Sequence, residues 1–172
     1  DNEFFKKYKE LDKAFLFENI GYNLRLSEPQ AAIGIFQLKL LDKFVNQRRK
    51  AAKEYLRFFN QHRDIFSFIE PSSKAKSSWF GFPIVLKGKL EGKKEFLKEF
   101  LFKNKIESRP FLAGDFSKQP VIRKFESIKN HSLDVVSKVG ENGLALPCHQ
   151  DIHKDEIDKI TSCIKKFIDK SL

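Results

Sequence analysis

Two polar segments carry the side chains best suited to binding an anion. The first is the turn from Gly21 to Arg25, in which Asn23 and Arg25 alternate with the burial-seeking residues Tyr22 and Leu24. Backbone N–H groups converge at the helix start that follows, and such a start is a natural anion site. The turn is therefore a candidate phosphate site; the alternative is that its two polar side chains only satisfy the turn itself.

The second segment centres on Arg109, which follows a short apolar run and precedes Pro110 and Phe111. A guanidinium binds phosphate or carboxylate in a bidentate geometry, so Arg109 is a candidate for contact with an anionic substrate. The glycine and prolines that follow, in Gly114-Asp115 and Gln119-Pro120, predict a loop. A lone surface arginine is the commoner alternative.

A third group places soft and imidazole side chains in one loop, as metal sites do: Cys148, His149 and His153. Their spacing matches no closed four-ligand pattern and a fourth ligand is not evident, so we predict no metal site. Cys148 is also a poor nucleophile candidate, because neighbouring side chains such as that of His149 rarely face each other. A polar loop leading into the last helix is the simpler interpretation.

The composition favours a cytoplasmic protein with a basic surface. The net charge of +10 suits an anionic partner, but the lysines and arginines form no run of five or more and compositional bias explains them equally well. Most of the 19 phenylalanines fall on periodic apolar faces, which indicates a core rather than stacking on nucleic-acid bases. Neither a signal peptide nor an apolar run of about 18 residues is present, so we predict no membrane partner.

A long amphipathic helix follows the first polar segment. Ser27 and Gln30 form a capping-box pattern, and Pro29 is tolerated in the first turn. Apolar residues then recur at helical spacing: Ile33, Phe36, Leu40, Phe44, Ala51, Tyr55 and Phe59. At about 1.5 Å per residue this rod of roughly 50 Å is longer than a small domain needs. We therefore expect residues 27–62 to connect two packing environments.

Residues 63–172 predict a small α+β domain with a three-stranded antiparallel sheet covered by helices. The three expected strands are 78–86, 106–111 and 143–147, and 65–70 is either a short strand or a loop. The expected helices are 93–104, 121–125, 133–139 (ended by Gly140) and 155–168. We interpret residues 1–26 as a lead-in segment that ends in a polar turn. Because the sequence contains no Met, we expect Asp1 to be a truncation point.

Four stretches of the chain resemble one enzyme family. GYNLRLSEPQAAIGIFQLKLLDKF resembles the segment GYN-x-R-x-x-x-x-QAA-x-G-x-x-Q-L-x-x-L of the DegT/StrS-type sugar-nucleotide aminotransferases, vitamin B6 enzymes of the aspartate-aminotransferase fold. SSWFGFPIVL, IESRPFLAGDFSKQPVI and LALPCHQDIHKDEIDKI resemble the small C-terminal domain of the same family. The resemblance extends from about residue 18 to residue 168.

The resemblance implies the C-terminal part of an enzyme that uses pyridoxal 5′-phosphate (PLP) and is a homodimer when complete. The Schiff-base lysine, or the histidine that replaces it in the 3-dehydrases, would lie upstream in a large domain, with most of the cofactor site. The resemblance implies that residues 1–26 are a lead-in and active-site turn that belong to this missing large domain. We therefore assign no catalytic residue here and expect the chain alone to be inactive. The family implies that Asn23 reaches the cofactor phosphate of the neighbouring subunit and that Tyr22 and Arg25 line the shared site. Arg109 and Phe111 are expected to face the substrate.

The implied reaction is amino transfer from a donor such as glutamate to a nucleotide-linked ketosugar, in lipopolysaccharide or surface-polysaccharide biosynthesis. The first alternative is a sugar-nucleotide 3-dehydrase of the same family, in which a histidine abstracts the proton and the C3 hydroxyl is expelled. The ending Cys148–Asp151 is typical of neither branch, so the choice stays open. The second alternative is a stand-alone basic α+β module that binds nucleic acid or an acidic partner.

Overall fold

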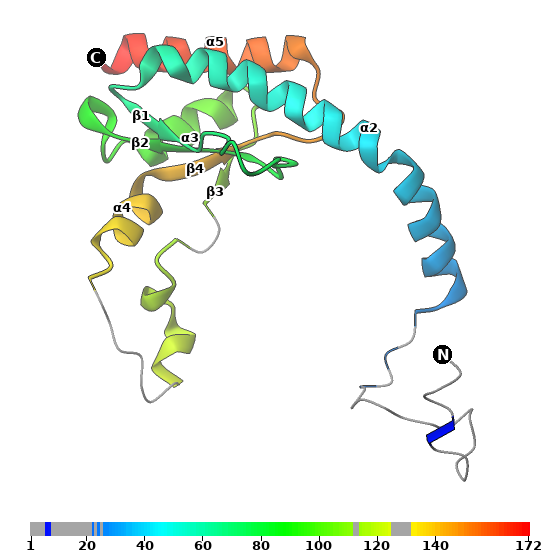
Figure 1. Ribbon diagram of the computed structural model, residues 1–172. Helices are drawn as coiled ribbons and strands as arrows, with labels where there is room; N and C mark the ends of the chain where they lie inside the picture. Colours follow the sequence, from blue (N-terminus) through cyan, green and yellow to red (C-terminus); the bar gives the residue numbers. More distant parts are fainter. Residues whose placement is uncertain (1–5, 8–21, 23, 25, 112–113, 125–131) are drawn as a thin grey trace. The chain divides into compact units, whose positions relative to one another are not determined.

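The structure, a computed structural model, describes most of the 172-residue chain (Figure 1). The described residues are 6–7, 22, 24, 26–111, 114–124 and 132–172. The chain divides into two compact units, residues 1–39 and residues 40–172, and the second unit holds the sheet. Its architecture is α+β, as the sequence predicted, with a small antiparallel sheet and helices.

The long helix α2 runs from Glu28 to Phe59, and the 3₁₀ turn η2 (Asn60–His62) follows it directly. At its start Gln30 accepts a hydrogen bond from the backbone N–H of Ser27 at 3.0 Å, which is one half of the predicted capping box. The Ser27 hydroxyl donates to the same Gln30 oxygen at 3.1 Å instead of accepting from the helix backbone. The predicted start of the helix is therefore confirmed, with a different second bond.

The two ends of α2 differ in burial. The fully buried residues of α2 all lie in its last third, and they are Ala51, Ala52, Tyr55 and Phe59. Large apolar side chains near its start are between 49% and 69% exposed, and they are Ile33, Ile35, Phe36, Leu38 and Leu41. These apolar residues surround the helix instead of forming one stripe, a pattern typical of a helix that is covered on several sides.

The sheet has four strands in the order β1-β2-β4-β3, and every pair is antiparallel. The strands are β1 (Phe66–Phe68), β2 (Phe82–Leu86), β3 (Arg109–Pro110) and β4 (Gly143–Leu146). The prediction of three strands was one too few, because the ambiguous segment 65–70 pairs with β2 through Phe66 and Leu86. The predicted strand 78–86 starts only at Phe82, and Trp79 before it has a left-handed φ of 54° that no strand allows.

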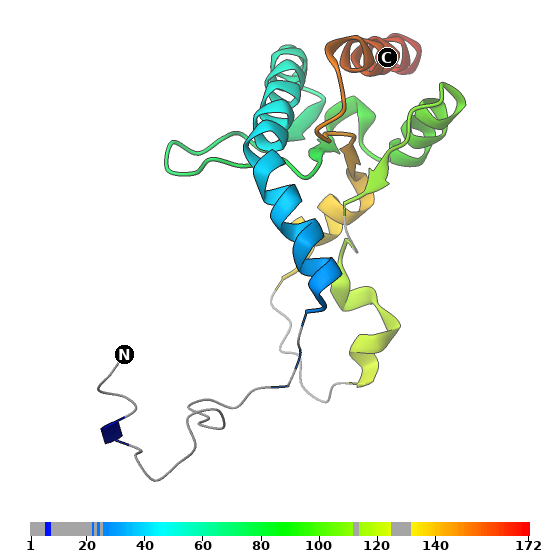
Figure 2. The ribbon, with the colours of Figure 1, turned by 90° about the vertical axis from the view of Figure 1, so that its right-hand side faces the viewer.

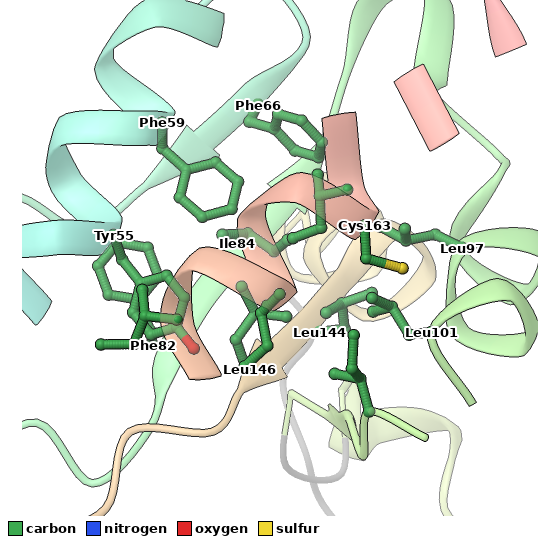
Figure 3. Packing of buried hydrophobic residues seen from close by; sticks show 14 of the residues in the cluster. Tyr55, Phe59, Phe66, Phe82, Ile84, Leu97, Leu101, Leu144, Leu146 and Cys163 are labelled. Carbon is green, nitrogen blue, oxygen red and sulfur yellow. The ribbon is translucent and has the colours of Figure 1, made fainter. Parts of the chain in front are cut away.

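One face of the sheet forms the core. Its side chains are at most 1% exposed: Phe82, Ile84, Leu86, Leu144 and Leu146. Aromatic rings of α2 cover this face, with the Phe59 ring stacked 5.5 Å from Phe82 and the Tyr55 ring 4.9 Å from it (Figure 3). Helices α3 (Lys94–Lys103) and α5 (Lys154–Ser171) complete the same cluster with residues such as Leu97 and Ile164.

The other face of the sheet is more open. Helix α4 (Asp134–Asn142) lies beyond it, opposite α5 and the second half of α2 (Figures 1 and 2). The prediction that Gly140 ends this helix was wrong, since the helix continues for two more residues. A Cβ at Gly140 would lie 3.1 Å from the backbone nitrogen of Asp115 and 3.3 Å from the Cα of Gly114. Gly140 therefore permits a close contact with the loop.

Three 3₁₀ segments connect the remaining elements, and they are η3 (Gly88–Leu90), η4 (Phe116–Lys118) and η5 (Pro120–Lys124). Segment η5 corresponds to the short helix predicted over 121–125. No helix in the described part of the chain is long and apolar enough to span a bilayer.

Candidate functional site

Arg109 stands on the open face of the sheet. It pairs with Ala145 of β4, and Ala145 also pairs with Pro83 of β2. Residues that face each other across antiparallel strands point to the same side. Pro83 and Ala145 are half-buried, whereas their strand neighbours Phe82 and Leu146 lie in the core. The Arg109 side chain therefore projects on the side away from the core.

Phe111 belongs to the same face. A Cβ at Gly143 would lie 3.3 Å from the Cβ of Phe111, so the half-buried phenylalanine occupies space that the glycine leaves open. Gly143 pairs with Val85, whose side chain is also half-buried. The structure thus brings the two predicted substrate residues Arg109 and Phe111 to one surface, beside a row of small residues.

The guanidinium of Arg109 is held only weakly. Its side chain is 71% exposed, and its Nε donates to Glu107 Oε1 at 3.1 Å. Exposed ion pairs of this kind contribute about 0.2–1 kcal/mol. A phosphate, which can accept two hydrogen bonds from one guanidinium, competes well with such a pair. Arg109 is therefore suited to binding an anionic group that approaches the open face.

The loop after Phe111 is anchored by a buried carboxylate. Asp115 is 8% exposed; its Oδ1 accepts from the Ser117 hydroxyl at 2.6 Å and from the Ser117 N–H at 3.1 Å. Its Oδ2 accepts from the hydroxyl of Ser137, on α4, at 2.6 Å. The hydrogen bonds from Ser117 and Ser137 hold the pKa of Asp115 below its ordinary value.

The sequence reasoning did not single out Asp115. The spacing Asp-x-Ser is typical of an Asx turn, so the local hydrogen bond to Ser117 could have been predicted from the sequence. The bond to Ser137 joins residues 22 positions apart, and no local pattern predicts it.

The first polar segment is described only in part. Tyr22 is 88% exposed. Asn23 and Arg25, predicted to bind the cofactor phosphate and the substrate, lie outside the described residues. The start of α2 is exposed from Ser27 to Gln30. An exposed helix start leaves room for an anion. Because Asn23 and Arg25 are not described, their binding of a phosphate stays a prediction.

The Cys148 loop shows no arrangement for chemistry. The buried Cys148 thiol lies 3.5 Å from the carbonyl oxygen of Arg48, and burial raises its pKa to about 11. His149 Nδ1 accepts from the N–H of Asp151, and His153 precedes α5. Within the described residues, no group of three or more His, Cys, Asp or Glu side chains is placed to hold a metal.

Tyr55 joins this loop to α2. Its hydroxyl donates to the carbonyl oxygen of Pro147 at 3.0 Å. Burial, more than the nearby Cys148 and Glu156, raises the pKa of Tyr55 far above its ordinary value, so the ring stays neutral. The side chain of Arg48 adds a second link, donating to Gln150 Oε1 at 3.0 Å. These contacts hold the loop that contains Pro147 and Gln150 against α2.

Comparison with known proteins gives a consistent set of relatives. The model of the DegT/DnrJ/EryC1/StrS aminotransferase family matches residues 4–165. A GDP-4-keto-6-deoxy-D-mannose 3-dehydratase of Escherichia coli O55:H7 is 33% identical over 162 residues, which cover 93% of this chain and 41% of the relative. A UDP-4-amino-4,6-dideoxy-N-acetyl-beta-L-altrosamine transaminase of Helicobacter pylori is 27% identical over 165 residues, covering 94% of this chain and 43% of the relative.

Solved structures of both kinds share the fold. A GDP-4-keto-6-deoxymannose-3-dehydratase with a trapped PLP-glutamate geminal diamine superposes with a TM-score of 0.77 at 34% identity, over 88% of this chain and 39% of that one. Helicobacter pylori PseC, an aminotransferase involved in the biosynthesis of pseudoaminic acid, gives a TM-score of 0.74 at 26% identity, over 99% and 47%. The chain spans about two fifths of the length of the curated relatives it matches.

Proposed function

The chain belongs to the DegT/DnrJ/EryC1/StrS aminotransferase family, and from that premise we propose that it is the C-terminal part of an enzyme acting on a nucleotide-linked ketosugar. Members of the family are PLP-dependent aminotransferases and dehydratases of sugar nucleotides. The family match over residues 4–165 leaves little of the chain for the alternative of a stand-alone basic module.

The proposed reaction is 3-dehydration of the ketosugar. The observation that carries this choice is the identity of 33% to a 3-dehydratase, against 27% to a transaminase over a similar length. The sequence alone had favoured amino transfer as the first candidate reaction and 3-dehydration as the second. Amino transfer remains the second candidate because transaminases of the family match nearly the whole chain. Glutamate is the proposed amino donor, since the related 3-dehydratase structure holds a PLP-glutamate adduct.

Within this chain, the open face of the sheet is the proposed substrate surface. Arg109 would bind the diphosphate, because its guanidinium is exposed and shares only a weak surface ion pair. Phe111 would pack its ring against the sugar or the base. Both residues would hold the substrate in place while the reacting atoms lie elsewhere.

The cofactor site would lie mainly outside this chain. When bound, PLP supplies an electron sink for bond cleavage at the substrate carbons. We propose that Asn23 donates a hydrogen bond to its phosphate in the neighbouring subunit, and that Tyr22 and Arg25 line the shared site. The exposed ring of Tyr22 and the exposed start of α2 fit such a contact. No catalytic residue is assigned here, so the chain alone should be inactive.

The complete enzyme is proposed to be a cytoplasmic homodimer in lipopolysaccharide or surface-polysaccharide biosynthesis. A related protein of Salmonella typhimurium is a lipopolysaccharide biosynthesis protein. The apolar side chains exposed around the first half of α2 support an assembly that covers them.

The test uses the complete enzyme that contains this chain, loaded with PLP. It is incubated with glutamate and with GDP-, UDP- and dTDP-linked 4-keto-6-deoxy sugars, and the products are analysed by mass spectrometry. A product that has lost the C3 oxygen supports 3-dehydration, and a product with an amine in place of the keto oxygen supports amino transfer. If all three sugars are recovered unchanged, the proposal is wrong.

A further inference from the structure

Strand β3, which carries Arg109, is held only weakly by the sheet. It is two residues long and lies at the edge of the sheet, where it pairs with β4 alone. Its second residue, Pro110, has no N–H to donate to the ladder. This pairing sets the side on which Arg109 projects, but Phe111 follows the strand and has no ladder partner in it. A second anchor is needed to hold Arg109 and Phe111 over the open face.

The loop that follows supplies this anchor. The N–H of Gly114 donates to the carbonyl oxygen of Phe111 at 3.1 Å, which links the loop backbone directly to the phenylalanine. A Cβ at Gly114, whose φ is 63°, would lie 3.1 Å from the Cα of Gly140 on α4. The loop backbone is therefore in direct contact with the helix.

Asp115 joins the two surfaces at this contact. One carboxylate oxygen accepts from Ser117 within the loop, and the other accepts from Ser137 on α4. Both hydroxyl distances are 2.6 Å, as expected for charge-assisted hydrogen bonds. The Lys118 Nζ lies 3.9 Å from Asp115 Oδ2; its side chain is 60% exposed and also contacts Glu141.

We propose that Asp115 is a positioning residue that fixes the loop to α4 through Ser137 and thereby sets Arg109 and Phe111 for the substrate. The inference rests on the proposed function, because it assumes that these two residues bind a nucleotide-linked sugar. Asp115 itself does not touch the substrate. Its carboxylate is instead committed on both oxygens to the fold.

The test compares two serine-to-alanine variants in the complete enzyme. Ser137→Ala removes the link from α4 to the loop. Ser132→Ala is the matched control, since the Ser132 hydroxyl also donates to an aspartate at 2.6 Å, but that residue, Asp134, begins the same helix. We expect Ser137→Ala to raise KM for the sugar nucleotide about tenfold, equivalent to about 1.4 kcal/mol, with little change in kcat. Ser132→Ala should leave both constants unchanged.

Two further measurements separate positioning from a loss of stability. Amide hydrogen exchange should accelerate at Ser117 in Ser137→Ala and not in Ser132→Ala. Asp115→Asn keeps one acceptor oxygen and should give a KM between those of the wild type and Ser137→Ala. Should KM stay unchanged, or should it change without faster exchange at Ser117, the positioning role is overturned. An inactive wild-type enzyme would overturn the proposed function, and the positioning role with it, whatever the exchange shows.

Discussion

Phe111 lies against Gly143 at the point where β4 begins, and a Cβ on the glycine would be 3.3 Å from the Cβ of the phenylalanine. The same Cβ would be 2.4 Å from the carbonyl oxygen of Val139. Gly143 therefore serves two contacts: it lets α4 lead directly into β4, and it lets Phe111 lie close to the sheet.

Replacing this glycine should destabilise the fold. In Gly143→Ala the new methyl group meets a backbone carbonyl, which cannot rotate away as a flexible side chain can. Overpacking of this kind costs about 1–3 kcal/mol. We expect a lower free energy of unfolding in urea and increased exposure of Phe111. The control is Gly34→Ala inside α2, where nothing lies within 4 Å and the higher helix propensity of alanine should be neutral or stabilising. Equal stability of the two variants would contradict the proposed packing.

Neutralising Arg109 should weaken substrate binding more than turnover. Arg109→Gln removes a charged donor, and a hydrogen bond to a charged group contributes about 1.5–3 kcal/mol, so KM should rise roughly 10- to 100-fold. Arg57→Gln is the control, because Arg57 is also exposed and paired with a glutamate, on α2. Steady-state kinetics of the complete enzyme measure both constants. A KM for Arg109→Gln equal to that of Arg57→Gln would remove Arg109 from the site.

The sequence predicted element types better than their lengths. The helical spacing of apolar residues in α2 and α5 can be read from the local sequence, and both helices were predicted within a few residues. Strand β2 was predicted too long because Trp79 looks like a strand residue, whereas its backbone is left-handed and its ring stacks on Phe82 at 5.5 Å. The glycine at 140 was read as a helix end because its tertiary contact with Gly114 leaves no trace in the local sequence.

The candidate site was predictable in the same partial way. Residue type and position marked Arg109 and Phe111, but only Arg109 lies in β3, and the place of Phe111 beside the sheet comes from its contact with Gly143. The register that sets Phe111 over Gly143 depends on pairing across 32 positions, which spacing alone does not give. The anchor from Asp115 to Ser137 is non-local for the same reason.

The two cysteines should resist modification in the folded protein. Cys148 is 2% exposed and Cys163 is 6% exposed, and burial raises the pKa of both thiols. The thiolate is the reactive form, so at a pH near 8 a disulfide reagent should label neither residue in buffer and both in concentrated urea. Peptide mapping identifies which thiol reacts. Rapid labelling of native Cys148 would show that its loop is open and would restore it as a candidate nucleophile.

The bonds to Asp115 should make part of the stability depend on pH. Because hydrogen bonds from Ser117 and Ser137 lower its folded pKa, the carboxylate stabilises the fold at any pH above its unfolded pKa of about 3.9. This contribution is lost as the pH falls from about 3.9 through the lower folded value. Asp115→Asn has no proton to gain in this range, so the difference in unfolding free energy between wild type and variant should be constant near neutrality and shrink in acid.

Urea titrations between about pH 2.5 and 7 measure this difference. Other carboxylates, such as Glu99, whose pKa is lowered by its bond with Lys103, titrate equally in both proteins and cancel. In Ser137→Ala the acid-dependent part should be smaller, because one of the bonds that lower the pKa is gone. Parallel curves for wild type and Asp115→Asn down to the lowest pH would mean that the carboxylate is not held by these hydroxyls.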